Sequence, residues 1–129
     1  MVKAISYQDT YEIRHKVMWP DRDLDYIKLD CDPEGDHYGY FLDDHLVSVI
    51  SVFKTSHGYQ FRKFATLHDY QGKGIGSELL KYVKDKYQNL WCNARIEKTD
   101  FYKRFGLRET DETFTKGGKE YVIMRTQDI

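Results

Sequence analysis

A short glycine-rich run, residues 71–77 (QGKGIGS), has the composition of an anion-binding loop. Gly72, Gly74 and Gly76 leave the surrounding backbone amides bare, although glycine at a helix start costs backbone entropy. An amphipathic helix is predicted directly after them, so its first amides and its dipole would present positive charge to a phosphate or diphosphate. The run therefore predicts a diphosphate-binding loop at the start of a helix.

Two familiar glycine-rich loops do not match this spacing. A Walker loop, G-x-x-x-x-G-K-[ST], needs a lysine before its hydroxyl residue, whereas Gly76 precedes Ser77. A dinucleotide fingerprint needs G-x-G-x-x-G after a first strand, and the three glycines here alternate with single residues. The spacing favours another kind of phosphate-bearing ligand.

Alternating helical and strand patterns surround the loop. Ile75, Leu79, Leu80 and Val83 recur at helical spacing, which predicts an amphipathic helix over 75–87. The other expected elements are a helix over 10–18, strands over 38–42, 46–53, 59–67 and 90–94, a helix over 98–105, and a hairpin of 113–115 and 120–124. The Asp-rich segment 19–37 reads as a loop with a helical turn around 24–27.

Length and composition favour one globular domain over residues 1–129, since the chain has 129 residues and 40% hydrophobic content. No apolar stretch approaches the ~20 residues that cross a bilayer, and the N-terminus lacks the apolar run of a secretory leader. Cys31 and Cys92 are too far apart for a C-x-x-C site, which favours reduced thiols in the cytoplasm and no bound metal. Scattered lysines without a basic cluster argue against nucleic acid.

The net charge of −1 is unevenly distributed along the chain. Residues 1–57 carry 11 acidic and 6 basic side chains, a net of −5, and residues 58–129 carry 10 acidic and 14 basic ones, a net of +4. An anionic ligand on the basic part and a cationic substrate on the acidic part would fit this division. Chance fluctuation over short segments explains it equally well.

In these motifs the sequence resembles the GNAT superfamily of acetyl-CoA-dependent N-acyltransferases. Residues 71–76 match its signature [R/Q]-x-x-G-x-[G/A] without a mismatch, and Phe64 and Thr66 stand where the preceding strand of the family carries apolar residues. Residues 101–107 (FYKRFGL) match its aromatic pair followed by Gly and an apolar residue. The segments agree in order and spacing over about residues 47–107.

The resemblance implies a mixed α/β fold. Its centre is a mostly antiparallel sheet of six to seven strands, with helices on both faces. The sheet is splayed between the strands that are the fourth and fifth in the family, here 59–67 and 90–94. Two positions depart from the family pattern, since Arg95 and Lys98 stand where many members have Asn and a small Ala. Residues 1–45 carry no motif, as is usual for the variable acceptor-binding part.

The resemblance also implies an activity: direct transfer of an acetyl group from acetyl-CoA to a primary amine of a small molecule or peptide, without a metal. Tyr102 matches the tyrosine that protonates the leaving thiolate in many members. The strand edge would pair with the pantetheine arm and the loop amides would bind the diphosphate. The residues expected to bind acetyl-CoA are Phe64, Ala65, Thr66, Gln71, Gly72, Lys73, Gly74, Ile75, Gly76 and Ser77.

The general base is left open by the sequence, because the strand before the loop offers Phe61, Arg62 and Lys63 but no carboxylate. The weak candidates near strand ends and on the first helix are His15, His57, His68, Asp69 and Glu97. Each is also typical of a surface residue, so a water molecule relayed by backbone carbonyls is the default.

The sequence leaves the catalytic route and the assembly of the chain open as well. Cys92 could form an acyl-cysteine, but a buried inert thiol is commoner. Missing an evident base, the chain could be a non-catalytic acyl-CoA sensor or regulatory module. A longer acyl chain would need space near Phe53, Phe64 and Trp91. An unpaired last strand, 120–124, would offer a contact for a homodimer.

Overall fold

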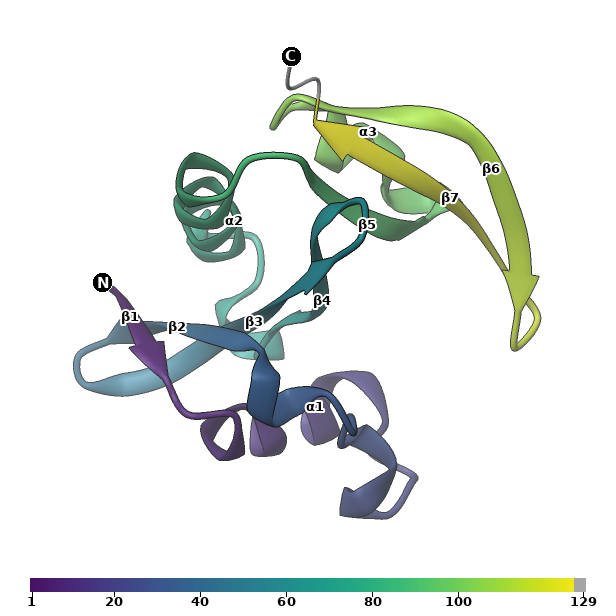
Figure 1. Ribbon diagram of the computed structural model, residues 1–129. Helices are drawn as coiled ribbons and strands as arrows, with labels where there is room; N and C mark the ends of the chain where they lie inside the picture. Colours follow the sequence, from purple (N-terminus) through teal and green to yellow (C-terminus); the bar gives the residue numbers. More distant parts are fainter. Residues whose placement is uncertain (127–129) are drawn as a thin grey trace.

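A computed structural model describes residues 1–126 of the chain, which form one seven-stranded sheet with helices on both faces (Figure 1). The sheet order is β1-β2-β3-β4-β5-β7-β6. The strands are β1 (Val2–Ile5), β2 (Asp36–Leu42), β3 (His45–Thr55), β4 (Gly58–Thr66), β5 (Leu90–Arg95), β6 (Leu107–Lys116) and β7 (Lys119–Thr126). The α-helices are α1 (Tyr11–Met18), α2 (Ile75–Lys86) and α3 (Thr99–Lys103), and short 3₁₀ turns include Leu24–Ile27 and Asp32–Glu34.

All neighbouring strands are antiparallel except β4 and β5, which are parallel and joined through α2. These two strands pair only at their beginnings, where Tyr59 lies opposite Leu90 and Gln60 opposite Trp91. β4 continues to Thr66 without further pairing on that side. The expected splay between the fourth and fifth strands is therefore confirmed, and it leaves one edge of β4 open.

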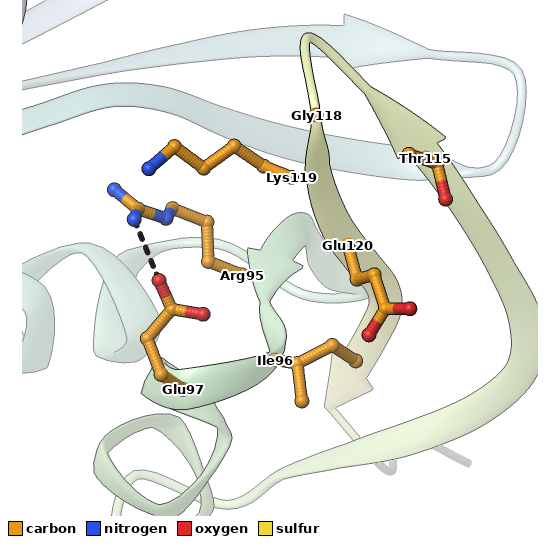
Figure 2. Close-up of a pocket in the computed structure, with 7 residues that line it drawn as sticks. All are labelled: Arg95, Ile96, Glu97, Thr115, Gly118, Lys119 and Glu120. Atoms are coloured by element: carbon orange, nitrogen blue, oxygen red, sulfur yellow. Dashed lines mark ion pairs between the residues drawn. The ribbon is translucent and has the colours of Figure 1, made fainter.

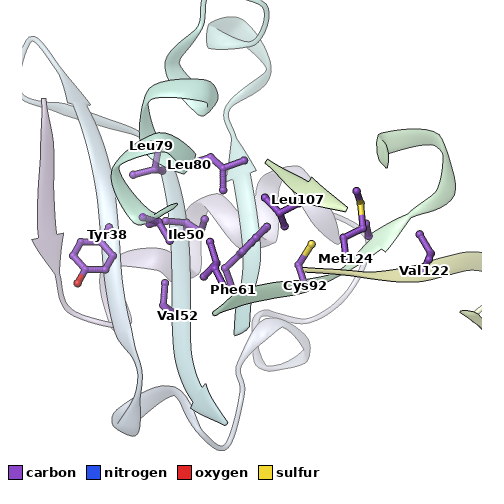
Figure 3. Close-up of a cluster of buried hydrophobic side chains, with 13 residues drawn as sticks. Tyr38, Ile50, Val52, Phe61, Leu79, Leu80, Cys92, Leu107, Val122 and Met124 are labelled. Atoms are coloured by element: carbon purple, nitrogen blue, oxygen red, sulfur yellow. The ribbon is translucent and has the colours of Figure 1, made fainter. Parts of the chain in front are cut away.

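One face of the sheet packs against α2 and α3. The apolar face of α2 buries Leu79, Leu80 and Val83 against Ile50 and Phe61 of β3 and β4 (Figure 3). These α2 side chains are the ones that the helical spacing predicted. Burial of each contributes about 1.5–3 kcal/mol, so this contact holds α2, and the loop before it, firmly against the sheet.

The other face of the sheet packs against α1 and covers a buried polar network. Arg14 donates hydrogen bonds from Nη1 and Nη2 to the two carboxylate oxygens of Asp32 at 2.8 and 2.9 Å, and from Nη2 to Ser51 Oγ at 2.9 Å. His37 adds a 2.7 Å contact from Nδ1 to the same hydroxyl. The network ties the Asp-rich segment 19–35 to α1 and β3, so this segment is anchored at Asp32.

Several sequence expectations need correction. The expected strand 120–124 is part of β7, which pairs with β5 on one side and β6 on the other, so it is not an unpaired edge. β6 is longer than the expected 113–115, and α3 is shorter than 98–105. Val2–Ile5 was not anticipated as a strand; it forms an edge, β1, paired with β2. In residues 1–126 no helix is long and apolar enough to cross a membrane.

Candidate functional site

The glycine loop presents a row of free backbone amides at the start of α2. Gly72 and Gly74 have φ values of +77° and +81°, which few other residues adopt without strain, and Gly74 occupies the position just before the helix. The first main-chain hydrogen bond of the helix runs from Glu78 N–H to the Gly74 carbonyl. Within the described chain, the six amides from Gly72 to Ser77 therefore have no backbone acceptor and can bind an external anion.

The loop also has the open space that such an anion needs. A Cβ atom added at Gly72 or Gly74 would meet nothing within 4 Å. Lys73 is exposed beside these glycines, with Nζ 5.7 Å from the ring centroid of Tyr70, while Ile75 is buried and anchors the helix start. The expected diphosphate-binding residues thus form one accessible loop with a fixed helical end.

Gln71 has a different position from the glycines. Its side-chain Nε2 donates a 2.9 Å hydrogen bond to the carbonyl of Thr66, and its backbone amide donates to His68 O at 3.3 Å. The side-chain amide and the backbone amide of Gln71 therefore both donate hydrogen bonds within the protein. In the structure, Gln71 fastens the loop to the end of β4.

Gly76 allows the first turn of α2 to approach β4 closely. A Cβ atom there would lie 3.3 Å from Thr66 Oγ1 and 3.4 Å from Phe64 Cζ, which is tighter than ordinary contact. An added Cβ would force the side chains of Thr66 and Phe64 to shift by a few tenths of an ångström. The loop amides and the end of β4 are therefore adjacent, as binding of one extended ligand to both would require.

The open edge of β4 offers the backbone amide of Thr66. Leu67 N–H donates to Val47 O at 2.9 Å, so Leu67 and Ala65 direct their backbone groups toward β3, and Thr66 between them directs its groups toward the splay. The Thr66 carbonyl is taken by Gln71. Of the three residues expected on this edge, Thr66 directs an amide into the splay that has no sheet partner among residues 1–126. Phe64 lies at the register shift between β3 and β4, and Ala65 packs on the α1 face.

Tyr102 lies on α3 at the same splay. Its ring centroid is 5.7 Å from that of Phe61 and 5.4 Å from that of Phe101. No hydrogen bond joins the Tyr102 hydroxyl to another group among residues 1–126. The only side-chain polar atom in this range that is both fully enclosed and without a partner is Arg14 Nε, so the Tyr102 hydroxyl has some accessible surface. Burial raises the pKa of Tyr102, with a smaller contribution from Cys92, so the phenol stays protonated at neutral pH.

The thiol of Cys92 is unsuited to covalent chemistry. It is buried in the core beneath α2 and α3, and this burial raises its pKa to about 12. A thiol with such a pKa is almost entirely protonated at neutral pH and is a poor nucleophile. The structure therefore favours direct transfer over an acyl-cysteine.

The five candidate bases are scattered over the molecule. His15 Nε2 lies 2.6 Å from the Arg22 carbonyl, His68 Nδ1 lies 3.4 Å from Gln71 Nε2, and Glu97 forms an ion pair with Arg95 at 2.6 Å. His57 and Asp69 are exposed in turns. None of the five lines the hollow at the splay described next.

A hollow of about 170 Å³ lies at the splay, on the α1 side of the sheet. Three of its side chains are cationic, and we call it the basic hollow. It is lined by Met18, Gln60, Phe61, Arg62, Lys63, Asn93, Phe114, Lys116 and Tyr121. The sequence analysis mentioned Arg62 and Lys63 only to show that their strand has no carboxylate. It missed Lys116, because nothing local in the sequence shows that the β6–β7 hairpin brings Lys116 beside β4.

A second hollow, of about 520 Å³, lies between the end of β5 and the β6–β7 hairpin (Figure 2). Its charged residues are of both signs, and Arg95 and Glu97 already neutralise each other. It is lined by Arg95, Ile96, Glu97, Thr115, Gly118, Lys119 and Glu120. No residue of β4 or of the glycine loop contributes to it, so it lies apart from the candidate site.

The whole arrangement matches one family. The family model for the GNAT acetyltransferase domain matches residues 2–127. The chain is 36% identical to the uncharacterized N-acetyltransferase YitI of Bacillus subtilis, and the match covers 88% of this chain and 85% of that protein. This chain therefore belongs to the GNAT acetyltransferase family, as the resemblance in its motifs predicted.

Solved structures agree with the fold. An acyl-CoA N-acyltransferase from Pseudomonas aeruginosa superimposes with a TM-score of 0.78 at 14% identity, covering 98% of each chain. A GNAT family acetyltransferase from Elizabethkingia anophelis, crystallised with acetyl-CoA bound, superimposes with a TM-score of 0.74 at 16% identity, covering 98% of this chain and 96% of that one. The protein thus has the fold of this class of acyltransferases.

Proposed function

We propose that this acetyltransferase moves an acetyl group from acetyl-CoA to a primary amine by direct transfer. The observation that carries the proposal is the row of six amides at the start of α2, Gly72 to Ser77, which have no backbone acceptor in the described part of the chain. A diphosphate suits such a row, and the open edge of β4 beside it suits the amides of a pantetheine arm. The structural neighbour from Elizabethkingia anophelis that binds acetyl-CoA supports this choice of donor.

The chemistry follows from the groups around the splay. A neutral amine attacks the thioester carbon, and negative charge grows on the carbonyl oxygen, where the backbone amide of Thr66 can donate a hydrogen bond. The carbon–sulfur bond then breaks, and the leaving thiolate takes a proton from the Tyr102 hydroxyl. The amine loses its own proton to water, since no carboxylate or histidine among residues 1–126 lines the basic hollow, and water returns a proton to the Tyr102 phenolate.

Release of free coenzyme A from acetyl-CoA in the presence of an amine panel tests this activity. Replacing Tyr102 by Phe removes the proton donor but keeps the ring that packs on Phe61. We expect kcat to fall about 10²-fold or more while the Kd for coenzyme A stays within twofold. An unchanged kcat would remove Tyr102 from the mechanism.

A non-catalytic acyl-CoA sensor is the second candidate, and the missing base at the splay is the observation that favours it. It predicts tight binding of acetyl-CoA without thiol release for any amine. The same assay separates the two.

We further propose a cytoplasmic location, because Cys31 and Cys92 are both free thiols.

A further inference from the structure

The charged residues that line the basic hollow are all cations. Arg62 and Lys63 reach it from β4 and Lys116 reaches it from β6, and no carboxylate among the described residues lines it. Like charges brought together raise the free energy of the folded protein unless an anion neutralises them. The arrangement is therefore explained if a negatively charged group binds there.

None of these three cations has a partner among residues 1–126. Over residues 1–126 neither an ion pair nor a hydrogen bond joins the side chain of Arg62, Lys63 or Lys116 to another group. Elsewhere cations do find carboxylates, as Lys28 does with Asp25 at 2.8 Å. Three cations without a carboxylate partner thus line one hollow at the splay.

An irregularity in β4 brings two of the cations together. The register between β3 and β4 shifts between Val49 and Ser51, and Lys63 has a φ of +55°, a strained value for a lysine. This bulge inserts one residue, so Arg62 and Lys63 both line the basic hollow instead of pointing to opposite faces. Burial lowers the pKa of Lys63, and the charge of Arg62 lowers it further.

The rest of the hollow is suited to a short carbon chain. The rings of Phe114 and Tyr121 stack with their centroids 5.1 Å apart, and Met18 adds apolar surface. Arg62 of β4 and Asn93 of β5 both line the hollow, so it lies at the splay between these strands, where the acyl group would be transferred. Its volume of about 170 Å³ is below the ~300–1,000 Å³ of most ligand pockets, which suits a small molecule or one end of a larger one.

We propose that the amine acceptor carries a carboxylate or a phosphate, and that this anionic group binds Arg62, Lys63 and Lys116 in the basic hollow. The inference rests on the proposed acetyl transfer and names the class of its acceptor. It replaces the cationic acceptor that the division of charge along the sequence suggested. Two of the N-terminal carboxylates that suggested it, Asp25 and Asp32, are paired with Lys28 and Arg14.

Amines of matched chain length test the proposal. Butylamine, 4-aminobutyrate and 1,4-diaminobutane differ mainly in a neutral, anionic or cationic far end, and phosphoethanolamine with ethanolamine makes the same comparison for a phosphate. We expect kcat/KM for one anionic amine to exceed that of its neutral partner about 10-fold or more, because charge-assisted hydrogen bonds to Arg and Lys are strong. Equal or better turnover of the neutral or cationic amines would overturn the proposal.

Charge-removing variants link the preference to the hollow. Lys63→Met and Lys116→Met should each reduce the preference for the anionic amine about 10-fold and leave kcat/KM for the neutral amine within twofold. Lys54→Met, an exposed lysine on β3 outside the hollow, is the matched control and should change neither value. An anionic preference that survives both hollow variants would place the anion elsewhere. Circular dichroism and the Kd for coenzyme A confirm that each variant is folded.

Calorimetry separates this inference from the proposed activity. If no amine yields free coenzyme A, acetyl transfer fails, and the anion site is then judged by titrating 4-aminobutyrate and phosphoethanolamine into protein saturated with coenzyme A. Binding that Lys63→Met abolishes upholds an anionic ligand in the hollow. Absence of binding by both compounds, together with absent turnover, overturns it.

Discussion

The side-chain amide of Gln71 donates a 2.9 Å hydrogen bond to the carbonyl oxygen of Thr66, the last residue of β4. This bond joins the loop that carries the free amides to the strand whose edge is open. Because α2 also packs closely on β4 at Gly76, the two halves of the expected binding surface keep a fixed relation. A ligand that contacts both halves then binds without having to order them first.

Removing this bond should weaken coenzyme A binding. A hydrogen bond of this kind contributes about 1 kcal/mol, so we expect Gln71→Ala to raise the Kd for coenzyme A about 5-fold. Isothermal titration calorimetry measures it. Gln88→Ala, at an exposed position just beyond α2, is the matched control. Equal Kd values for the two variants would show that the bond does not organise the loop.

Cys92 should be dispensable for turnover. Its raised pKa, about 12, and its burial predict no labelling by iodoacetamide at pH 8, whereas Cys31 is only half-buried and should be accessible to the reagent. We expect Cys92→Ala to keep kcat within twofold and to lower the free energy of unfolding by about 1–2 kcal/mol through lost packing. Loss of turnover in a variant that still binds coenzyme A would revive the acyl-cysteine.

The Arg14–Asp32 pair should control both stability and its acid dependence. Burial by itself raises the pKa of Asp32, but hydrogen bonds from Arg14 and the Leu29 amide outweigh it and hold the pKa below its usual value. The folded state thus favours the ionised carboxylate. Its contribution is present above the unfolded pKa of ~3.9 and is lost as the pH falls through the lower folded value.

Urea unfolding of Asp32→Ala measures this contribution. Leaving Arg14 buried without its partner should cost about 3–5 kcal/mol at pH 7, and the variant should lose less stability than the wild type between pH 5 and pH 3. Asp30→Ala, an exposed carboxylate in the same segment, is the control and should stay within about 0.5 kcal/mol of the wild type. A cost no larger for Asp32→Ala than for the control would show that the pair does not anchor the segment.

The sequence predicted those parts of the fold that local patterns encode. Ile75, Leu79 and Val83 recur at helical spacing, and they are the residues that α2 buries. The glycine loop was identified in the same way, because three glycines before a helix have a local physical meaning. Edge strand β1 was missed, since only four residues, Val2–Ile5, form it and its pairing with β2 is a long-range property.

The basic hollow could not be predicted from the chain alone. Lys63 enters it through a bulge that depends on the register with β3, and Lys116 enters it through the path of the β6–β7 hairpin. Counting charges along the sequence pointed to the acidic N-terminal part instead. Whether a charge is free depends on its neighbours in space, and Asp32 is held by Arg14.

The most direct test of the account is an NMR titration of ¹⁵N-labelled protein with coenzyme A, dephospho-coenzyme A and pantetheine. The first two carry the diphosphate and the third lacks it. We predict that both diphosphate compounds shift the amide signals of Gly72 to Ser77, and that pantetheine leaves these signals in place and binds far more weakly. Unmoved loop signals with coenzyme A, or equal affinity for pantetheine, would contradict the central claim that these main-chain amides bind the diphosphate.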